Sequence, residues 1–472
     1  MPRPPNSQAR EALRHLLSRD GPTAPGDLAR ALDVSPPSVY RMLAEMGDDV
    51  VVAGHTRQRR VALRRQVRGV LSELPLYRID EAGRASPAGV LALIRPDGCY
   101  APMEPLGWPE LAKQEGWWDG LPYPIYEMRP QGYLGRRVAR ALSAQLRVSE
   151  DPQQWSDDDV VMYLSQHGRD QAGNLIAGDA AMQEWSRARA QGRIECIAEG
   201  DIGRRYVELA TEAIGTGVVG SSAGGEFPKF TAARELAGAA TPHVIVKFSG
   251  ADDSPAVRRW SDLLVCEHLA LNALAAFGHE VARSRIVQAG GRTFLESERF
   301  DRHGEFGRSA LASLSSVEAA LIGAGAGAAW PDVVGASAAK GMFRGDVHPR
   351  VEELHWFGRF IANTDMHHGN LSFRAEGGEL VLAPAYDMLP MAYAPLRGGE
   401  VAQPTFPPNA FPAQPAGKEA GWSRMLVAAS YFWNSAAADA RISAQFRAIC
   451  AQNAAALDNF RQVWNDVEES AG

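Results

Sequence analysis

The sequence contains no long hydrophobic run and few cysteines. No run of about eighteen apolar residues occurs, so we expect no membrane-spanning helix and no membrane partner. The first residues lack the apolar core of a signal peptide, which predicts a cytoplasmic protein. The 4 cysteines are scattered and form no Cys-x-x-Cys pair, which indicates neither a zinc site nor a disulfide framework. The formal net charge of −7 argues against a chain coated in nucleic acid.

The length of the chain predicts more than one domain. At 472 residues it is too long for a single hydrophobic core, so two or three domains are expected. We expect a small helical unit over residues 1–68 and a small mixed α/β region over 69–206. A two-lobed region would follow, with an N-lobe over 207–300 and a mostly helical C-lobe over 301–472. The predicted fold class is α+β.

Residues 7–65 have the pattern of three short helices followed by a β-hairpin. Apolar residues recur on one face of each predicted helix, and Gly21 and Gly47 mark two helix ends. Ser35 is expected to cap the third helix, with Pro36 at its first position. Residues 50–63 then form two short strands about a basic turn. This pattern resembles a winged helix-turn-helix.

In a winged helix-turn-helix the third helix enters the major groove of DNA and the wing contacts phosphate. We therefore expect DNA as a partner, and a homodimer, because such units commonly bind as two-fold dimers. A basic, solvated face on a protein-interaction domain is the alternative. The candidate DNA-binding residues are Ser38, Tyr40 and Arg41 on the helix and Arg57, Arg59 and Arg60 on the wing.

The next region, residues 66–150, indicates a small sheet without recognisable chemistry. Apolar segments at 71–77 and 89–94, with a Pro-Asp-Gly turn at 96–98, predict strands. The aromatic residues between 108 and 126 are more simply explained as core or interface than as a ligand cage.

The stretch 360–373 has the spacing of a phosphoryl-transfer loop. In protein kinases a loop aspartate accepts the proton of the substrate hydroxyl, an asparagine five residues later holds a metal ion, and a later aspartate holds the metals that bridge the nucleotide phosphates. Asp365, Asn370 and Asp387 have this order. The alternative is a turn-forming asparagine with a capping aspartate.

Two adjacent histidines lie inside this loop. His367 occupies the position, two residues after the predicted catalytic aspartate, where kinases have a basic residue. It would then face a phosphate. The alternatives for His367 and His368 are a metal-binding pair or a solvated loop.

Upstream features occur in the order found in a kinase. A glycine-rich segment at 220–229 could cradle phosphate, because backbone N–H groups approach an anion closely where no Cβ intervenes. Lys247 lies inside an apolar strand, which is costly unless an anion meets it. Glu267, on a predicted helix, is a candidate partner for this lysine, and an exposed helix acid is the alternative. Residues 301–304 would form a hinge between two lobes, where backbone groups would read an adenine.

Five motifs occur in this order: Ser222-Ala-Gly-Gly-Glu-Phe-Pro-Lys229, Val244-Ile-Val-Lys-Phe248, Glu298-Arg-Phe-Asp-Arg302, Asn363-Thr-Asp-Met-His-His-Gly-Asn370 and Ala383-Pro-Ala-Tyr-Asp387. Over roughly residues 207–470 they resemble the HipA family of toxin-antitoxin serine/threonine kinases. The fused N-terminal unit is similar to the YjjJ-like subgroup of that family.

The resemblance implies an ATP- and Mg²⁺-dependent serine/threonine protein kinase. Asp365 would be the catalytic base, and Asn370 and Asp387 would hold the metal. The family can autophosphorylate a serine in its glycine-rich loop, which displaces the loop from ATP; Ser222 stands at that place, with Ser221 beside it. The implied ATP-binding residues are Gly224, Gly225, Glu226, Phe227, Pro228, Lys229, Lys247, Glu298, Arg299, Phe300, His367, Asn370, Tyr386 and Asp387.

The sequence departs from the family in two ways. Gly369 stands where the family usually has a lysine, and a DNA-binding unit appears fused to the chain, which suggests autoregulation without a separate antitoxin. Family members act on translation factors such as an aminoacyl-tRNA synthetase, but nothing in these residues selects a protein substrate. Two other functions stay open: a nucleotide-sensing DNA-binding regulator with a weak or inactive kinase fold, and a small-molecule kinase.

Overall fold

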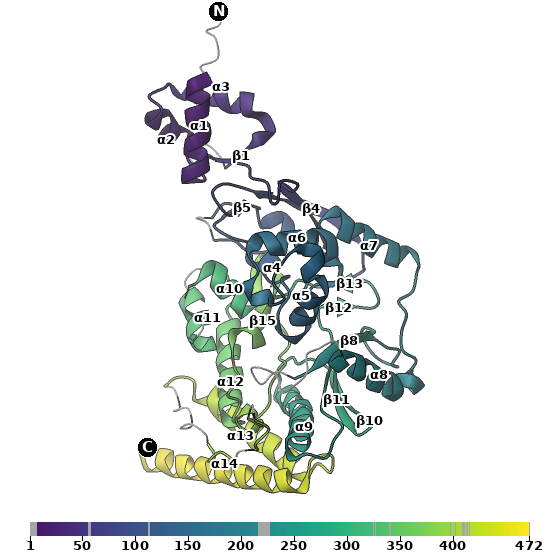
Figure 1. Cartoon of the computed structure of the whole chain (residues 1–472). Helices are drawn as coiled ribbons and strands as arrows, with labels where there is room; N and C mark the ends of the chain where they lie inside the picture. The colour runs from purple at the N-terminus through teal and green to yellow at the C-terminus, as the bar shows by residue number, and fades with distance from the viewer. Residues whose placement is uncertain are drawn as a thin grey trace, which may run out of the picture.

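The computed structural model contains a mixture of helices and sheets, as the sequence predicts (Figure 1). The structure describes residues 7–54, 58–111, 114–215, 227–323, 325, 327–338, 341–396, 398–401, 403–407, 411, 414 and 416–471. In this part of the chain no helix is long and apolar enough to cross a membrane.

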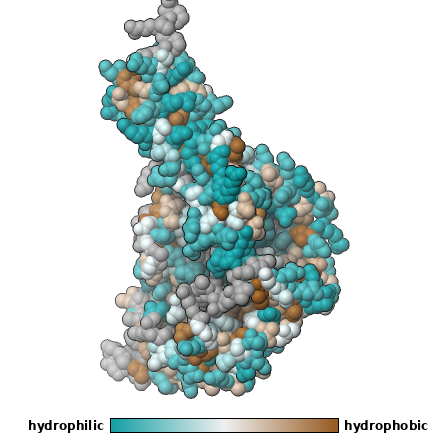
Figure 2. All heavy atoms as spheres, viewed as in Figure 1, coloured by the Kyte–Doolittle hydropathy of each residue, from teal (hydrophilic) through white to brown (hydrophobic). Residues whose placement is uncertain are grey.

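The N-terminal unit contains the three predicted helices and the hairpin. They are α1 (Ser7–Asp20), α2 (Pro25–Ala31), α3 (Pro36–Met46), β1 (Val50–Ala53) and β2 (Arg60–Leu63). Apolar side chains such as Leu13, Leu17 and Val39 form a separate small core. The expected cap differs: the Ser35 hydroxyl hydrogen-bonds the Ser38 hydroxyl at 2.9 Å instead of a backbone N–H. In Figure 2 this unit is a largely hydrophilic head on one end of the molecule.

The hairpin of the N-terminal unit packs on the next sheet. Its Val51 and Ala62 are buried with Ala92, Ile94 and Trp117. The sheet is antiparallel, in the order β6-β5-β4-β3-β7. Its elements are β3 (Glu73–Ile79), β4 (Ala85–Leu93), β5 (Cys99–Tyr100), β6 (Trp117–Trp118) and β7 (Leu175–Ala177). The helices of this part are α4 (Tyr123–Tyr126), α5 (Gly132–Leu146), α6 (Asp157–His167) and α7 (Asp179–Ala190), of which α6 and α7 contact β7. We call this part of the chain the middle domain.

A second antiparallel sheet, in the order β10-β11-β9-β8, carries the lysine strand between two helices. Because side chains alternate along a strand, Val244, Val246 and Phe248 point to one face, where they pack on Tyr206 of α8. Lys247 points to the other face. The elements are α8 (Ile202–Gly215), β8 (Lys229–Ala233), β9 (His243–Phe248), α9 (Pro255–Ala276), β10 (Ser284–Ala289) and β11 (Arg292–Glu298).

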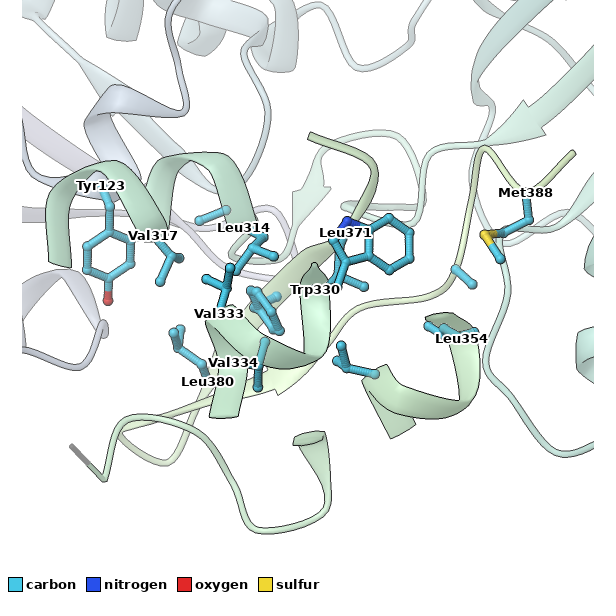
Figure 3. Close-up of a cluster of buried hydrophobic side chains, with 14 of the residues drawn as sticks. Tyr123, Leu314, Val317, Trp330, Val333, Val334, Leu354, Leu371, Leu380 and Met388 are labelled. Atoms are coloured by element: carbon cyan, nitrogen blue, oxygen red, sulfur yellow. The ribbon is translucent and has the colours of Figure 1, made fainter. Parts of the chain in front are cut away.

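The remaining chain contains helices of up to 28 residues and several short strands. Its helices are α10 (Leu314–Leu321), α11 (Trp330–Ala338), α12 (Val347–Phe360), α13 (Glu419–Ala438) and α14 (Ala444–Ala471). Its strands are β12 (Arg302–His303) paired with β13 (Gly307–Arg308), and the sheet of β14 (Ala312–Ser313), β15 (Ser372–Glu376) and β16 (Glu379–Leu382). Figure 3 shows the buried cluster beneath this sheet, with Trp330, Val333 and Val334 of α11 beside Leu371 and Leu380.

A buried ion network stiffens the four-stranded sheet. The Arg234 side chain is 1% exposed, and it donates to Glu296 and to Glu298, each at 2.9 Å. Glu296 also accepts from the Tyr206 hydroxyl at 2.6 Å and from Arg285 at 2.8 Å. Every carboxylate in the network therefore has a partner.

Removing the arginine should destabilise the chain strongly. We expect Arg234→Ala to lower the free energy of unfolding by about 3–5 kcal/mol, because it leaves buried carboxylates uncompensated. The matched control is Arg205→Ala on α8, whose side chain is 41% exposed and pairs with Glu208; it should cost under about 1 kcal/mol. Equilibrium urea unfolding measures both values. Equal losses for the two variants would contradict the role given to Arg234.

Candidate functional site

A cavity of about 1070 Å³ lies where the lysine strand, the Asp365 loop and the middle domain meet. Its walls include Lys229 and Lys247 from the sheet, and Asp365 and Asn370 from the loop. This volume is slightly above the range of roughly 300–1,000 Å³ found for small-molecule sites. The cavity therefore brings together residues that lie more than a hundred positions apart.

Lys247 is the central cation of this cavity. Its Nζ lies 2.7 Å from both carboxylate oxygens of Glu267, on α9, and it also contacts Oδ1 of Asp387. Glu267 is only 1% exposed, so the alternative of an exposed helix acid is wrong. Burial lowers the pKa of the Lys247 ammonium from its usual value, and Glu267 opposes that shift. The two carboxylates compensate a charge that would otherwise be costly to bury.

The Asp365 loop is held by side chains on both sides. The Oδ1 of Asn363 accepts from the Asp365 backbone N–H at 3.0 Å, and its Nδ2 donates to the Asp387 carbonyl at 3.4 Å. Asn370 donates its Nδ2 to the Asp365 carbonyl at 2.9 Å, which leaves its Oδ1 as an acceptor. Asn363 thus ties the loop to Asp387, a role that the sequence analysis missed although the residue lies inside the quoted motif.

Two non-glycine residues at this site have left-handed backbone conformations. Ala362 has a φ of 60° and Asp387 a φ of 54°. Such conformations cost about 1–3 kcal/mol each and persist only where the surroundings enforce them. Here they turn the chain immediately before Asn363 and present the Asp387 carboxylate to Lys247.

The two histidines of the loop have different environments. His367 is exposed, and its Nδ1 accepts from the Gly369 N–H at 3.0 Å. His368 is buried and its Nε2 hydrogen-bonds the Ala328 carbonyl at 2.8 Å. They therefore do not form a metal-binding pair, and only His367 borders the cavity. The described part of the chain contains no cluster of three or more His, Cys, Asp or Glu side chains that could hold a metal.

Aromatic side chains form another wall of the cavity. The Tyr386 and Phe300 rings lie 5.7 Å apart, and the Tyr386 hydroxyl donates to the Gly369 carbonyl at 2.7 Å. Burial raises the pKa of Tyr386, so its hydroxyl keeps its proton. Phe227 packs on Trp260 with ring centroids 4.6 Å apart, and the Pro228 carbonyl accepts from the Phe248 N–H. Gly224, Gly225, Glu226, Ser221 and Ser222 lie outside the described residues.

Glu298, Arg299 and Phe300, which the resemblance implies for ATP binding, line the cavity, but the polar groups of the first two are already used. The Glu298 carboxylate binds Arg234, and the Arg299 guanidinium binds Asp170 and Asp301. The N–H groups of Glu298 and Arg299 donate to the carbonyls of Arg283 and His243. In the expected hinge at residues 301–304, the N–H groups of Arg302 and Gly304 donate to the carbonyls of Arg299 and Ala240. Phe300 offers a ring face instead.

The middle domain contributes to the cavity, which corrects the expectation of a region without chemistry. Arg137 and Arg140 of α5 are among its lining residues. Asp170 joins the middle domain to the hinge by binding Arg302 at 2.7 Å, and the Gly173 N–H donates to Asp301 at 3.0 Å. The clustered arginines of α5 were the sequence signal that could have indicated this wall.

Two family models match the chain. Residues 70–186 match the model described as YjjJ-like toxin, middle domain, and residues 221–467 match the HipA-like C-terminal domain. Toxin YjjJ of Escherichia coli (strain K12) is 32% identical over 461 residues, which cover 97% of this chain and 99% of that protein.

The chain belongs to the HipA-like toxin family. Neither model extends into residues 1–69. Among solved structures, a chain of the Shewanella oneidensis MR-1 complex of HipA, HipB and operator DNA is 15% identical and covers 81% of this chain and 95% of that chain, with a TM-score of 0.48. The Helicobacter pylori proinflammatory kinase CtkA is 17% identical over 34% of this chain and 53% of that chain, with a TM-score of 0.26. Neither structural likeness carries a functional argument.

The glycine at position 369 leaves room for the His367 ring. A Cβ at Gly369 would lie 2.9 Å from Cε1 and 3.0 Å from Nδ1 of the His367 ring. A side chain at this position would displace the imidazole from its hydrogen bond with the Gly369 N–H. Gly369 and His367 therefore form one local arrangement, in which the imidazole lies at the cavity wall.

The buried lysine and glutamate should be energetically coupled. We expect Lys247→Met to lower the free energy of unfolding by about 3–5 kcal/mol, because it leaves Glu267 buried without its cation. In Lys247→Met/Glu267→Gln the second substitution should recover about 1–3 kcal/mol, the range of coupling for residues in contact. Urea unfolding of the two single variants and the double variant measures this term. Strictly additive losses would show that the pair is not coupled.

Proposed function

We propose that the chain is an ATP- and Mg²⁺-dependent serine/threonine protein kinase and, like its named relative, a toxin. The observation that carries the proposal is the placement of Lys247 between Glu267 and Asp387, in one cavity with Asp365 and Asn370. Kinases use a strand lysine paired with a helix glutamate, a loop aspartate and metal-binding Asn and Asp residues for phosphoryl transfer. The family membership supports the same reaction class.

The residues present fit a magnesium ion. Magnesium prefers oxygen ligands, and it usually takes one or two from the protein and the others from phosphate and water. Asp387 offers a carboxylate, and Asn370 offers an Oδ1 whose own amide nitrogen is already used. These two residues would hold the ion. When bound, it neutralises the negative charge of the phosphates.

Each residue has a distinct part in the proposed transfer. Asp365 accepts the proton of the acceptor hydroxyl as its oxygen forms a bond to the γ-phosphorus of ATP. The bond between that phosphorus and the β–γ bridging oxygen breaks, and ADP leaves with the bonding electrons. Lys247 supplies positive charge to the phosphates, and Glu267 keeps its side chain in place. Phe300 and Tyr386 offer aromatic surface for the base of the nucleotide.

Loss of the catalytic carboxylate should stop phosphorylation without removing the nucleotide site. We expect Asp365→Asn to lower phosphate incorporation about 10²–10⁴-fold, the usual contribution of a general base. Intact mass spectrometry after incubation with Mg²⁺ and ATP, with phosphopeptide mapping at Ser221 and Ser222, measures it. Asp346→Asn, an exposed carboxylate outside the cavity, is the control.

The outcomes separate the proposal from its rivals. Equal phosphate incorporation in the wild type and Asp365→Asn would remove Asp365 from the mechanism. Nucleotide binding without any phosphate transfer would favour a nucleotide-sensing DNA-binding regulator. Transfer to small hydroxyl compounds but to no polypeptide would favour a small-molecule kinase.

We also propose that the N-terminal unit is a winged helix-turn-helix that binds DNA. On α3, Tyr40 is 44% exposed and Arg41 is exposed. On the hairpin, Arg59 and Arg60 are exposed, whereas Arg57 lies outside the described residues. Within the described part of the chain, Arg41 and Arg60 are in no ion pair, so both charges are free to meet phosphate.

The full chain should bind DNA from upstream of its own coding sequence. We expect Arg41→Ala and Arg60→Ala to weaken this binding and each to reduce the slope of log K against log salt by about 0.9, the value for one phosphate contact. Arg84→Ala, an exposed arginine on the middle domain, should leave the affinity unchanged. Fluorescence anisotropy at several salt concentrations measures this. Binding no tighter than to unrelated DNA would contradict specific recognition.

A further inference from the structure

Glu127 is a carboxylate of the middle domain that lines the cavity and that the proposed transfer does not use. It follows α4 directly in the chain. Its Oε2 accepts three hydrogen bonds, from the Ser313 N–H at 2.9 Å, the Ser313 hydroxyl at 2.6 Å and the Ser316 hydroxyl at 2.5 Å. These donors, at the start of α10, hold the carboxylate in one orientation.

The second carboxylate oxygen of Glu127 remains available. Among the residues that the structure describes, no group donates a hydrogen bond to Oε1, and this oxygen is not sealed inside the protein. Burial raises the pKa of Glu127, and the hydrogen bonds from Ser313 and Ser316 oppose the shift. Because a carboxylate accepts hydrogen bonds at both oxygens, a further donor from a ligand would stabilise this partly buried group.

Glu127 lies beside the stretch that joins the aromatic wall to the metal residues. Ser313, which holds Glu127, is paired with Ser372 across β14 and β15, so the two serine side chains lie on the same face of the sheet. The Ser372 hydroxyl hydrogen-bonds the Tyr386 hydroxyl at 2.7 Å, and Ser372 follows Asn370 by two residues. All five residues line the cavity. With the base on Tyr386 and the phosphates at Asn370, the ribose that joins them falls beside Glu127.

The chemistry of a ribose suits an open carboxylate oxygen. Its hydroxyls are neutral donors, and acidic side chains hold ribose hydroxyls in the dinucleotide-binding folds. A hydrogen bond to an ionised acceptor is shorter and stronger than one between neutral groups. A phosphate at the same place would be repelled by the carboxylate, which favours the sugar over the phosphate chain.

We infer that Glu127 binds the ribose hydroxyls of the nucleotide through Oε1, so that the middle domain completes the nucleotide site. This inference rests on the proposed kinase function and adds a specificity-determining residue to its nucleotide site. Glu127 takes no part in the bond exchange. It distinguishes ribonucleotides from nucleotides that lack these hydroxyls.

The test compares the binding of ADP and of 2′,3′-dideoxy-ADP to the full-length chain with Mg²⁺, by isothermal titration calorimetry. Neither nucleotide has a γ-phosphate, so autophosphorylation does not interfere. We expect the wild type to bind ADP about tenfold or more tightly than the analogue, the effect of one hydrogen bond to a charged group. In Glu127→Ala the affinity for ADP should fall to that for the analogue, whereas the affinity for the analogue should change little.

Two further variants separate ribose binding from support of the fold. Glu127→Gln keeps the size of the side chain and an acceptor oxygen for the two serines, and it should lose most of the preference for ADP. It decides the test if Glu127→Ala does not fold. Glu184→Ala makes the same change as Glu127→Ala at an exposed carboxylate on α7 that does not line the cavity, and it should keep the preference.

Each outcome decides the inference. Equal affinity of the wild type for the two nucleotides, or a preference that survives both Glu127 substitutions, overturns the ribose contact. An equal loss of affinity for both nucleotides in the Glu127 variants also overturns it, because Glu127 would then only hold α10 against the middle domain. These results leave the kinase function standing. A wild-type chain that binds neither nucleotide overturns the proposed function and the inference with it.

Discussion

The structure of the cavity depends on a buried ammonium group. Lys247 is 8% exposed, in the middle of an apolar strand, and its charge is tolerated because Glu267 and Asp387 meet it. These three residues come from β9, α9 and the segment after β16, so their contact fixes the sheet, the helix and the C-terminal part relative to one another.

The loop that carries Asp365 is supported by packing beneath it. Trp330 lies in the buried cluster with Val333 and Leu371, and its Nε1 donates to the His367 carbonyl at 3.2 Å (Figure 3). On the helix side, a Cβ at Gly358 would lie 2.3 Å from the sulfur of Met366, so glycine allows the loop to approach α12 closely. The loop is thus held by a rigid hydrophobic base and by Asn363, which suits a site that needs precise positions.

The middle domain is joined to the hinge by buried ion pairs between side chains as well as by apolar packing. Asp170 and Asp301 both pair with Arg299 and Arg302. The pKa of each carboxyl is lowered below its usual range, because the attraction of the arginines outweighs the effect of burial. Removing one member of such a network leaves a buried charge without a partner. The wall that α5 gives to the cavity is therefore held at a fixed place beside the hinge.

The sequence by itself determined the local helices and strands and the order of the kinase-like motifs along the chain. Pro36 and the glycines at helix ends placed the N-terminal helices, and the spacing of Asp365, Asn370 and Asp387 indicated a phosphoryl-transfer loop, because turns, caps and short motifs depend on neighbours in the chain. The pairing of Lys247 with Glu267 was predicted from the analogy with kinases, and the structure brings the two residues together. Only the tertiary structure decided which distant surfaces meet. It showed that Asn363 ties the Asp365 loop to Asp387, that α5 lines the large cavity, and that Arg299 and Arg302 at the hinge pair with Asp170. Periodicity indicates which face of a helix or strand is buried, but the partner of that face depends on how the whole chain packs.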